Sequence, residues 1–255
     1  MSLIKKVAEK PGKPEGKDLS WRLRPPELQR FEAVETGCKA FDELVGGGLP
    51  VGLTSFYGVP GSGKTTLALH LALHNPKKSL YVITERIERR VYEFWKAGKL
   101  QVANYSAFRP RYDRFFREIV ELAKQLGAEI VVIDSITAVF NWESEIRGPV
   151  MQIAGQITNE GLAVIGISQA RGAGSIAGGY GVAHASTLVI AFEKILIDAS
   201  WLAKRYHANE GEYVWVIRIE KDAEGRSQQG EEYVYSWRGK PLISEPMFVR
   251  VTALE

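Results

Sequence analysis

A glycine-rich segment carries the most specific chemical signal in this sequence. The letters GVPGSGKT at Gly58–Thr65 fit the pattern G-x-x-x-x-G-K-[ST], and they lie between the apolar run LTSFYG and the helix-like run TTLALHLALH. Glycines let successive backbone N–H groups converge on an anion, and the following helix N-terminus adds partial positive charge. Lys64 can reach the β and γ phosphates of a nucleoside triphosphate, and the Thr65 hydroxyl suits Mg²⁺. The residues predicted to line this site are Gly58, Val59, Pro60, Gly61, Ser62, Gly63, Lys64, Thr65 and Thr66.

Two carboxylates follow apolar runs and would complete a hydrolytic site. Asp134 ends EIVVID, where it can hold Mg²⁺ directly or through water. Glu85 ends SLYVITE, where it can orient or deprotonate an attacking water. Each residue also has a plainer interpretation, because Asp134 can cap the next turn and Glu85 can favour the start of the following helix. Beside the phosphate segment, we predict the metal-binding role for Asp134 and the catalytic role for Glu85.

These side chains need a sheet to bring them together, and the chain supplies alternating strands and helices. The strand-like runs are at 53–58, 79–84, 129–134 and 162–168, and the helix-like runs are at 65–74, 86–98, 112–128 and 148–160. Such alternation predicts an α/β fold with a mostly parallel central sheet flanked by helices. Beyond Gly181, the runs STLVIAFEK, EYVWVIRIEKD and EEYVYSW predict antiparallel C-terminal strands that extend the sheet at one edge.

The size and charge of the chain limit its organisation. At 255 residues, with 45% hydrophobic residues, it can bury one substantial core, and no internal repeat indicates a duplicated one. Residues 1–30 carry eight Lys or Arg against four Asp or Glu, so the rest of the chain sums to −1 and the net charge of +3 is no argument for nucleic acid. We predict a basic, Pro/Gly/Lys-rich flexible tail at 1–30 and a single domain at 31–255.

Cysteine usage and hydropathy bear on the compartment. The single cysteine, Cys38, cannot form an internal disulfide, and the N-terminus has no secretory signal pattern. No uninterrupted apolar run approaches the roughly 20 residues of a membrane span. We therefore expect a cytoplasmic protein without a membrane partner.

Several motifs, in chain order, resemble those of the RecA and archaeal RadA recombinase superfamily. Within it, the short archaeal RadA paralogues such as the RadB family are most similar, and KaiC-like ATPases are near relatives. VETGCKAFDELVGGGLPVG at Val34–Gly52 is similar to the TG-x-x-x-LD-x-LLGGG lead-in of these ATPases, although Phe41 and Val45 stand where leucines are usual. Further resemblances are TE at Thr84–Glu85, DSITA at Asp134–Ala138, ISQ at Ile167–Gln169 and GVAHAST at Gly181–Thr187.

This resemblance covers about residues 34–240 and implies a RecA-like P-loop core that uses ATP and Mg²⁺. It also implies roles for three side chains. Tyr92 would stack on adenine, although its spacing equally suits packing against the sheet. Gln169 would sense the γ-phosphate and signal to the next loop, or it is an ordinary polar strand end. Lys221 would supply a cation to a neighbouring subunit's site, or it is a solvated charge at a hairpin end.

The resemblance further implies contacts with single-stranded DNA. ARGAGSIAGGYGVAH at Ala170–His184 corresponds to the second DNA loop, and its glycine content predicts irregular structure. Arg171 could contact a phosphate and Tyr180 could stack on a base, whereas a subunit-contact loop is the alternative. NWESEIRG at Asn141–Gly148 corresponds to the first DNA loop, with Arg147 as a possible contact.

The sequence also departs from full recombinases. Its thirty tail residues are too few for their N-terminal DNA domain, and no Phe-x-x-Ala polymerisation motif is evident there. We therefore favour a RadA-paralogue ATPase that binds single-stranded DNA and assists a recombinase or another repair protein. The alternatives are a KaiC-like ATPase that acts as a protein-interaction or signalling switch without DNA, and a structural component that binds ATP without turnover. The partner, the oligomeric state and the preferred DNA structure stay open.

Overall fold

The computed structural model describes residues 33–75, 78–107, 111–139, 147–170 and 179–251, and within these ranges it leaves out the side chains of 147–149, 151–152 and 179–180. The predicted boundary at residue 31 stays a prediction, because it lies outside these ranges. Among the described residues, none of the helices combines the length and the apolar character that crossing a bilayer would require.

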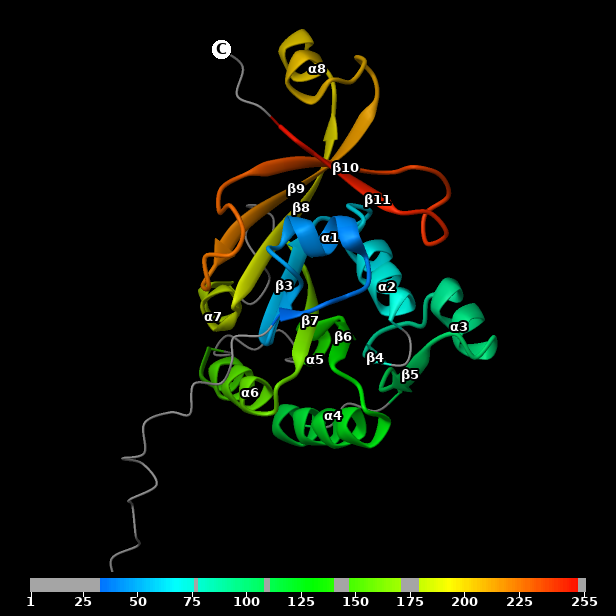
Figure 1. Ribbon diagram of the computed structural model, residues 1–255, viewed down its shortest axis with the longest axis vertical. Helices are drawn as coiled ribbons and strands as arrows, with labels where there is room; N and C mark the ends of the chain where they lie inside the picture. Colours follow the sequence, from blue (N-terminus) through cyan, green and yellow to red (C-terminus); the bar gives the residue numbers. More distant parts are fainter. Residues whose placement is uncertain (1–32, 76–77, 108–110, 140–146, 171–178, 252–255) are drawn as a thin grey trace, which may run out of the picture. The chain divides into compact units, whose positions relative to one another are not determined.

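A mixed sheet forms the centre of the described chain, with its strands in the order β11-β10-β9-β8-β3-β7-β6-β4-β5 (Figure 1). The strands from β8 to β5 in that order are parallel, and β9, β10 and β11 continue the sheet in antiparallel fashion. Their bounds are β3 (Gly52–Gly58), β4 (Ser79–Ile83), β5 (Gln101–Asn104), β6 (Ile130–Asp134), β7 (Ala163–Gln169), β8 (Leu188–Leu196), β9 (Tyr213–Asp222), β10 (Glu232–Trp237) and β11 (Pro246–Arg250). A separate short pair joins β1 (Ala33–Val34) to β2 (Leu49–Pro50).

Helices cover both faces of this sheet. On one face, α2 contacts β3, β4, β6 and β7, while on the other α6 contacts β3, β7, α4 and α7. Figure 1 shows α4 and α6 side by side. The helix bounds are α1 (Lys39–Leu44), α2 (Lys64–His74), α3 (Arg89–Lys96), α4 (Tyr112–Leu126), α5 (Ile136–Val139), α6 (Arg147–Asn159), α7 (Gly179–Ala185) and α8 (Ser200–Tyr206).

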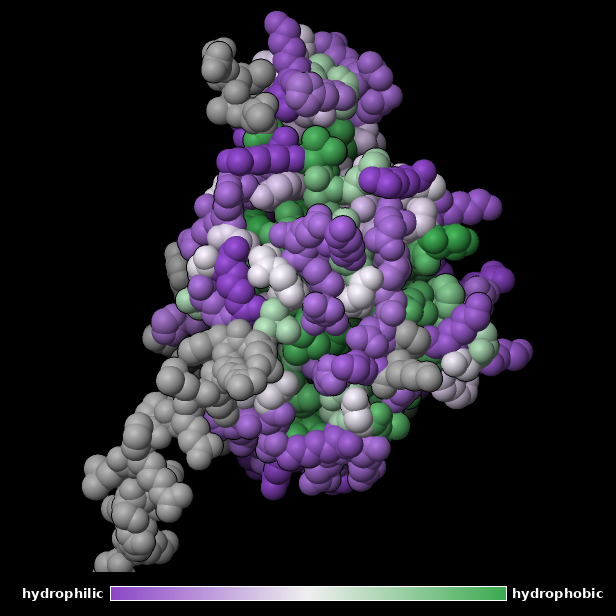
Figure 2. Space-filling view, viewed as in Figure 1, coloured by the Kyte–Doolittle hydropathy of each residue, from purple (hydrophilic) through white to green (hydrophobic). Residues whose placement is uncertain are grey.

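The strand sequences explain the two-sided core. In β6, Ile130 and Val132 belong to the cluster beneath α2, while Val131 and Ile133 belong to the cluster beneath α4 and α6. Successive side chains of a strand point to opposite faces, so a strand covered on both sides must be apolar throughout. Polar side chains cover most of the visible outer surface, with apolar patches between them (Figure 2).

The predicted fold class is confirmed, with corrections in two elements. The segment STLVIAFEK was expected to be antiparallel, but β8 pairs in parallel with β3, with Leu188 opposite Thr54, and the antiparallel part begins at β9. The glycine-rich stretch ending at His184 was expected to be irregular, yet its last residues form α7. Val182 is buried against the sheet there, so burial outweighs the poor helix propensity of glycine.

Candidate nucleotide-binding site

The phosphate loop lies between the end of β3 at Gly58 and the start of α2 at Lys64. Its backbone requires glycine at two positions. Gly58 has φ +155°, and a Cβ there would lie 2.0 Å from the carbonyl oxygen of Phe192. Gly63 has φ +94°, and a Cβ there would lie 2.9 Å from the ring of Tyr235. The strand-loop-helix order expected for a phosphate cradle is therefore present, with the N-terminus of α2 behind the loop.

Lys64 closes this loop from within. Its Nζ donates hydrogen bonds to the carbonyl oxygens of Gly58 at 2.9 Å and Val59 at 2.8 Å, and to Oγ of Ser62 at 3.3 Å. The side chain is buried, and this burial lowers the pKa of Lys64 to about 8, although the charge of Asp134 opposes the shift. A buried ammonium held by neutral carbonyls, and not by an ion pair, is suited to receiving an anion.

Asp134 stands at the end of β6 beside the start of α2. It accepts a hydrogen bond of 2.8 Å from the hydroxyl of Tyr81, and Thr65 also donates to it. Burial raises the pKa of Asp134, the carboxylates of Glu85 and Glu88 raise it further, and the hydrogen bonds from Tyr81 and Thr65 lower it. A half-buried carboxylate next to a hydroxyl, near the start of the helix that carries Lys64, offers the oxygen donors that Mg²⁺ takes.

Glu85 is fixed by a residue that sequence reasoning missed. The Oγ of Ser135 donates a hydrogen bond of 2.5 Å to Oε1 of Glu85 and lies 2.9 Å from the hydroxyl of Thr137. The carbonyl oxygen of Ser135 also accepts a hydrogen bond of 2.7 Å from Thr84. The motif DSITA contains this serine, so its proximity to Asp134 was the available signal. Ser135 thus links the predicted catalytic carboxylate to the strand that carries the predicted metal ligand.

Gln169 lies at the same edge of the sheet as Asp134 and Glu85. It ends β7 and stands opposite Gly58 in the strand register, and the N–H of the next residue, Ala170, donates to the carbonyl oxygen of Gly58 at 3.0 Å. The register also aligns Asp134 with Ile83 of β4, two residues before Glu85. The carboxyl ends of four adjacent strands, β3, β7, β6 and β4, therefore carry the phosphate loop, Gln169, Asp134 and Glu85.

Two further residues support the loop and were not predicted. The indole Nε1 of Trp215 on β9 donates a hydrogen bond of 3.0 Å to the carbonyl oxygen of Gly61. Arg90 donates a hydrogen bond of 3.2 Å to Oγ1 of Thr66. Tyr213 and Trp215 alternate with buried residues and share the exposed face of β9, a pattern that does not say which loop the face meets.

For two further predicted site residues, Tyr92 and Lys221, the described contacts do not involve the phosphate loop. Tyr92 on α3 is 46% exposed, and its ring contacts that of Trp95 at 5.8 Å between centroids. The Nζ of Lys221 on β9 donates to the carbonyl oxygens of Ala183 at 3.1 Å, His184 at 2.9 Å and Ser186 at 2.5 Å. Burial lowers the pKa of Lys221. The described contacts thus place Lys221 at the end of α7 in its own chain.

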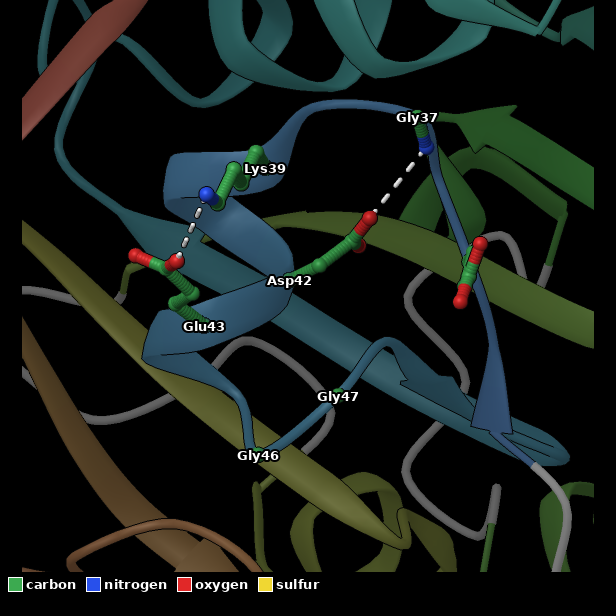
Figure 3. Close-up of a pocket in the computed structure, with 7 residues that line it drawn as sticks. Gly37, Lys39, Asp42, Glu43, Gly46 and Gly47 are labelled. Atoms are coloured by element: carbon green, nitrogen blue, oxygen red, sulfur yellow. Dashed lines mark hydrogen bonds and ion pairs between the residues drawn. The ribbon is translucent and has the colours of Figure 1, made fainter.

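The lead-in before the phosphate loop is held by Asp42. Its carboxylate accepts hydrogen bonds of 3.1 Å from the backbone N–H of Thr36 and 2.8 Å from the Thr36 hydroxyl, and one of 3.2 Å from the N–H of Gly37. Figure 3 shows Asp42 pointing from α1 toward Gly37, with the ion pair between Lys39 and Glu43 beside it. Thr36, Gly37 and Asp42, which are the T, G and D of the lead-in motif, thus form one hydrogen-bonded turn.

The predicted DNA contacts fall at the limits of the described chain. Arg171 lies outside the described residues. Arg147 and Tyr180 are described only as backbone positions in the first turns of α6 and α7. Their proposed roles therefore stay predictions.

Comparison with known proteins gives the relationships of the chain. Protein RecA of Synechocystis sp. is 31% identical over 177 residues, which cover 61% of this chain and 49% of that protein. DNA repair and recombination protein RadB of Thermococcus gammatolerans is 34% identical over 134 residues, which cover 49% of this chain and 61% of that protein. Among solved structures, a KaiC-like protein of Pyrococcus horikoshii OT3 superposes with a TM-score of 0.61 at 21% identity, over 87% of this chain and 100% of that one.

The chain thus spans between 49% and 61% of the length of these two curated relatives, and the KaiC-like structure is similar in fold. The family described as RecA N-terminal domain matches residues 3–172, which include the phosphate loop, Glu85, Asp134 and Gln169. The resemblance inferred from the sequence motifs is confirmed at this level, and the chain belongs to the RecA N-terminal domain family.

Proposed function

We propose that this chain binds ATP with Mg²⁺ and hydrolyses it. The observation that carries the proposal is the convergence of the phosphate loop, Gln169, Asp134 and Glu85 on the carboxyl ends of adjacent strands. Ligands of open α/β sheets bind at this edge. The fold and the family support the proposal, because a sequence that merely resembled a phosphate loop would not also place two carboxylates beside it.

The residues divide into three roles. The backbone N–H groups of Gly61–Thr66 and the Lys64 ammonium would hold the phosphates, since both present positive charge to an anion. Thr65 and Asp134 would hold Mg²⁺, which when bound neutralises charge on the phosphate oxygens. Glu85 would accept a proton from the attacking water, with its orientation fixed by Ser135. Gln169, which pairs with Gly58 in the strand register, would respond to the occupant of the loop.

We further propose that this chain binds single-stranded DNA and in this way assists homologous recombination or DNA repair. The curated names RecA and RadB of its relatives support this proposal, as does the glycine-rich segment before α7. A full-length recombinase or another repair protein would be the protein partner, and a second copy of this chain is the alternative partner.

Nucleotide turnover is tested with variants that separate binding from hydrolysis. Glu85→Gln keeps the size of the side chain but removes the base, so we expect ATP binding to persist while turnover falls by at least about 100-fold. Lys64→Ala should lose affinity for ATP itself. If Glu85→Gln hydrolyses ATP at the rate of the unaltered chain, the assignment of the catalytic carboxylate fails.

DNA binding is tested separately, with single- and double-stranded oligonucleotides across a salt series, with and without ATP. We expect the chain to bind single-stranded DNA more tightly than double-stranded DNA, and ATP to strengthen this binding. Rising salt should weaken the binding, because contacts to DNA phosphates release counterions. Arg171→Ala should weaken binding, whereas Arg89→Ala on exposed α3 serves as a charge-matched control. ATP turnover without any DNA binding at low salt would contradict the repair role and favour the KaiC-like alternative.

A further inference from the structure

Three parts of the chain that are far apart in sequence meet near the later turns of α2, away from the phosphate loop. Cys38 precedes α1 as its N-cap, His70 lies on α2, and Glu245 immediately precedes β11. One potential ligand atom from each of the three lies within 4.8 Å of the other two. The Sγ of Cys38 and Oε2 of Glu245 are 3.3 Å apart. A thiol, an imidazole and a carboxylate therefore share one small volume.

His70 is the unusual member of this group. It is fully buried, and neither of its ring nitrogens has a hydrogen-bond partner among the described residues. Its ring contacts are with His74 at 3.9 Å and with Trp237 at 4.8 Å between centroids, and these are not hydrogen bonds. A buried polar group left without a partner is destabilising, so native structures rarely keep one without a compensating partner.

His74, one helical turn further along α2, is placed to support the group. Its Nδ1 lies 3.1 Å from the carbonyl oxygen of His70, and its Nε2 lies 2.9 Å from Oε1 of Glu245. Because the carbonyl oxygen and the carboxylate both accept, Nδ1 must carry a proton, and Nε2 donates to Glu245 when it too is protonated. Outer histidines and carboxylates of this kind commonly fix the orientation of metal ligands.

We propose that Cys38, His70 and Glu245 bind a zinc ion, with His74 as the residue that positions Glu245. Mixed sulfur, nitrogen and oxygen donors suit Zn²⁺, whereas Mg²⁺ and Ca²⁺ take oxygen ligands. The site is separate from the nucleotide site, because its ligands come from the residue before α1, the later turns of α2 and the segment before β11. The Glu245 side chain is 47% exposed, which leaves a path for the ion from solvent.

The ion would act as a structural link. It would tie the lead-in helix α1 and the C-terminal strand β11 to α2, the helix whose first residue is Lys64. These elements already pack together, since α1 contacts β11 and the rings of Phe41 and Phe248 lie 6.3 Å apart between centroids. Metal binding would add to that packing and stabilise the folded chain over the unfolded one.

The direct test uses the untagged full chain, stripped of metal and kept in excess Mg²⁺ so that oxygen-rich sites are occupied. Equilibration with Zn²⁺ should give about one zinc ion per chain by elemental analysis and a higher unfolding temperature. Substitution with Co²⁺ should give a thiolate-to-cobalt charge-transfer absorption band. Because the chain has a single cysteine, that band would identify Cys38 as the ligand.

Variants make the test specific. Cys38→Ser should abolish the cobalt band and weaken zinc binding by more than about 100-fold, and His74→Gln should weaken it by about 10- to 100-fold. Glu245→Gln changes a partly exposed residue and should also weaken binding while the chain still folds. His207→Asn, at an exposed turn after α8, is the matched histidine control and should change nothing. Zinc binding unaltered in Cys38→Ser and Glu245→Gln, or no zinc retained by the unaltered chain, would overturn the proposal.

Discussion

The ammonium of Lys221 on β9 lies 2.9 Å from the carbonyl oxygen of His184, in the last turn of α7. It also donates to the carbonyl oxygens of Ala183 and Ser186. The last carbonyl groups of a helix lack partners within the helix, and a cation there is favoured by the helix dipole. Lys221 therefore holds the end of the helix that follows the glycine-rich segment.

This relationship predicts the effect of Lys221→Met, which keeps the aliphatic stem but removes the donor. We expect the free energy of unfolding to fall by about 1–2 kcal/mol, because three carbonyl groups lose a charged donor. Urea denaturation measures this change, with Lys204→Met on α8 as an exposed control. If stability is unaltered while ATP turnover is lost, Lys221 acts across a subunit boundary instead, as the family resemblance implied.

The hydrogen bond from Ser135 to Glu85 predicts that removing the Ser135 hydroxyl slows ATP hydrolysis only by disturbing the orientation of Glu85. In Ser135→Ala, Glu85 keeps its charge and loses the donor that holds it. We expect kcat for ATP hydrolysis to fall by about 10- to 100-fold with little change in KM, because misplacement of a catalytic group slows the chemical step. Steady-state kinetics measure kcat and KM separately. The matched control is Ser106→Ala, outside the site, and an equal loss in both variants would contradict the orienting role.

Much of the fold could be predicted because its signals are local. The apolar runs at β3, β6 and β7 and the phosphate loop between β3 and α2 follow from strand composition and glycine spacing. Asp134 and Glu85 end adjacent strands, so parallel pairing alone brings them to one edge. The confirmed part of the prediction is the fold class, which rests on these local strand, helix and turn signals, whereas the roles of the site residues stay predictions.

The remainder depends on contacts between distant segments. Trp215 reaches Gly61 across 154 positions, and Cys38 reaches Glu245 across 207. No periodicity encodes such pairs, because they arise only when β9 and β11 are added to the edge of the sheet. The parallel pairing of β8 and the helix α7 were missed for the same reason: burial against β3, and not local composition, decides both.

The indole of Trp215 predicts a measurable contribution to the phosphate loop. Trp215→Phe keeps an aromatic ring and removes the N–H that bonds the carbonyl oxygen of Gly61. A neutral hydrogen bond is worth about 1 kcal/mol, so ATP affinity should weaken about fivefold as the loop loosens. Titration with a fluorescent nucleotide analogue gives the affinity. Trp201→Phe, on exposed α8, is the matched control. Equal affinities in the two variants would show that the bond does not order the loop.

Gly58 and Gly47 both have positive φ, but they differ in the space that a methyl group would find. We therefore expect them to differ in their tolerance of alanine. In Gly58→Ala the new Cβ would lie 2.0 Å from the carbonyl oxygen of Phe192, which belongs to the backbone of β8 and cannot move aside freely. In Gly47→Ala nothing lies within 4 Å of the new atom, although φ is +110°. Both variants carry backbone strain, so the difference between them isolates the clash.

We expect Gly58→Ala to lower the free energy of unfolding by about 1–3 kcal/mol more than Gly47→Ala does, as is typical of overpacking in a core. Nucleotide binding should fall in the first variant alone, because its phosphate loop must shift to relieve the contact. Denaturation curves and nucleotide titrations on both variants give the two comparisons. If Gly58→Ala is as stable as Gly47→Ala, β3 and β8 do not approach each other as closely at Gly58 as the strand register requires.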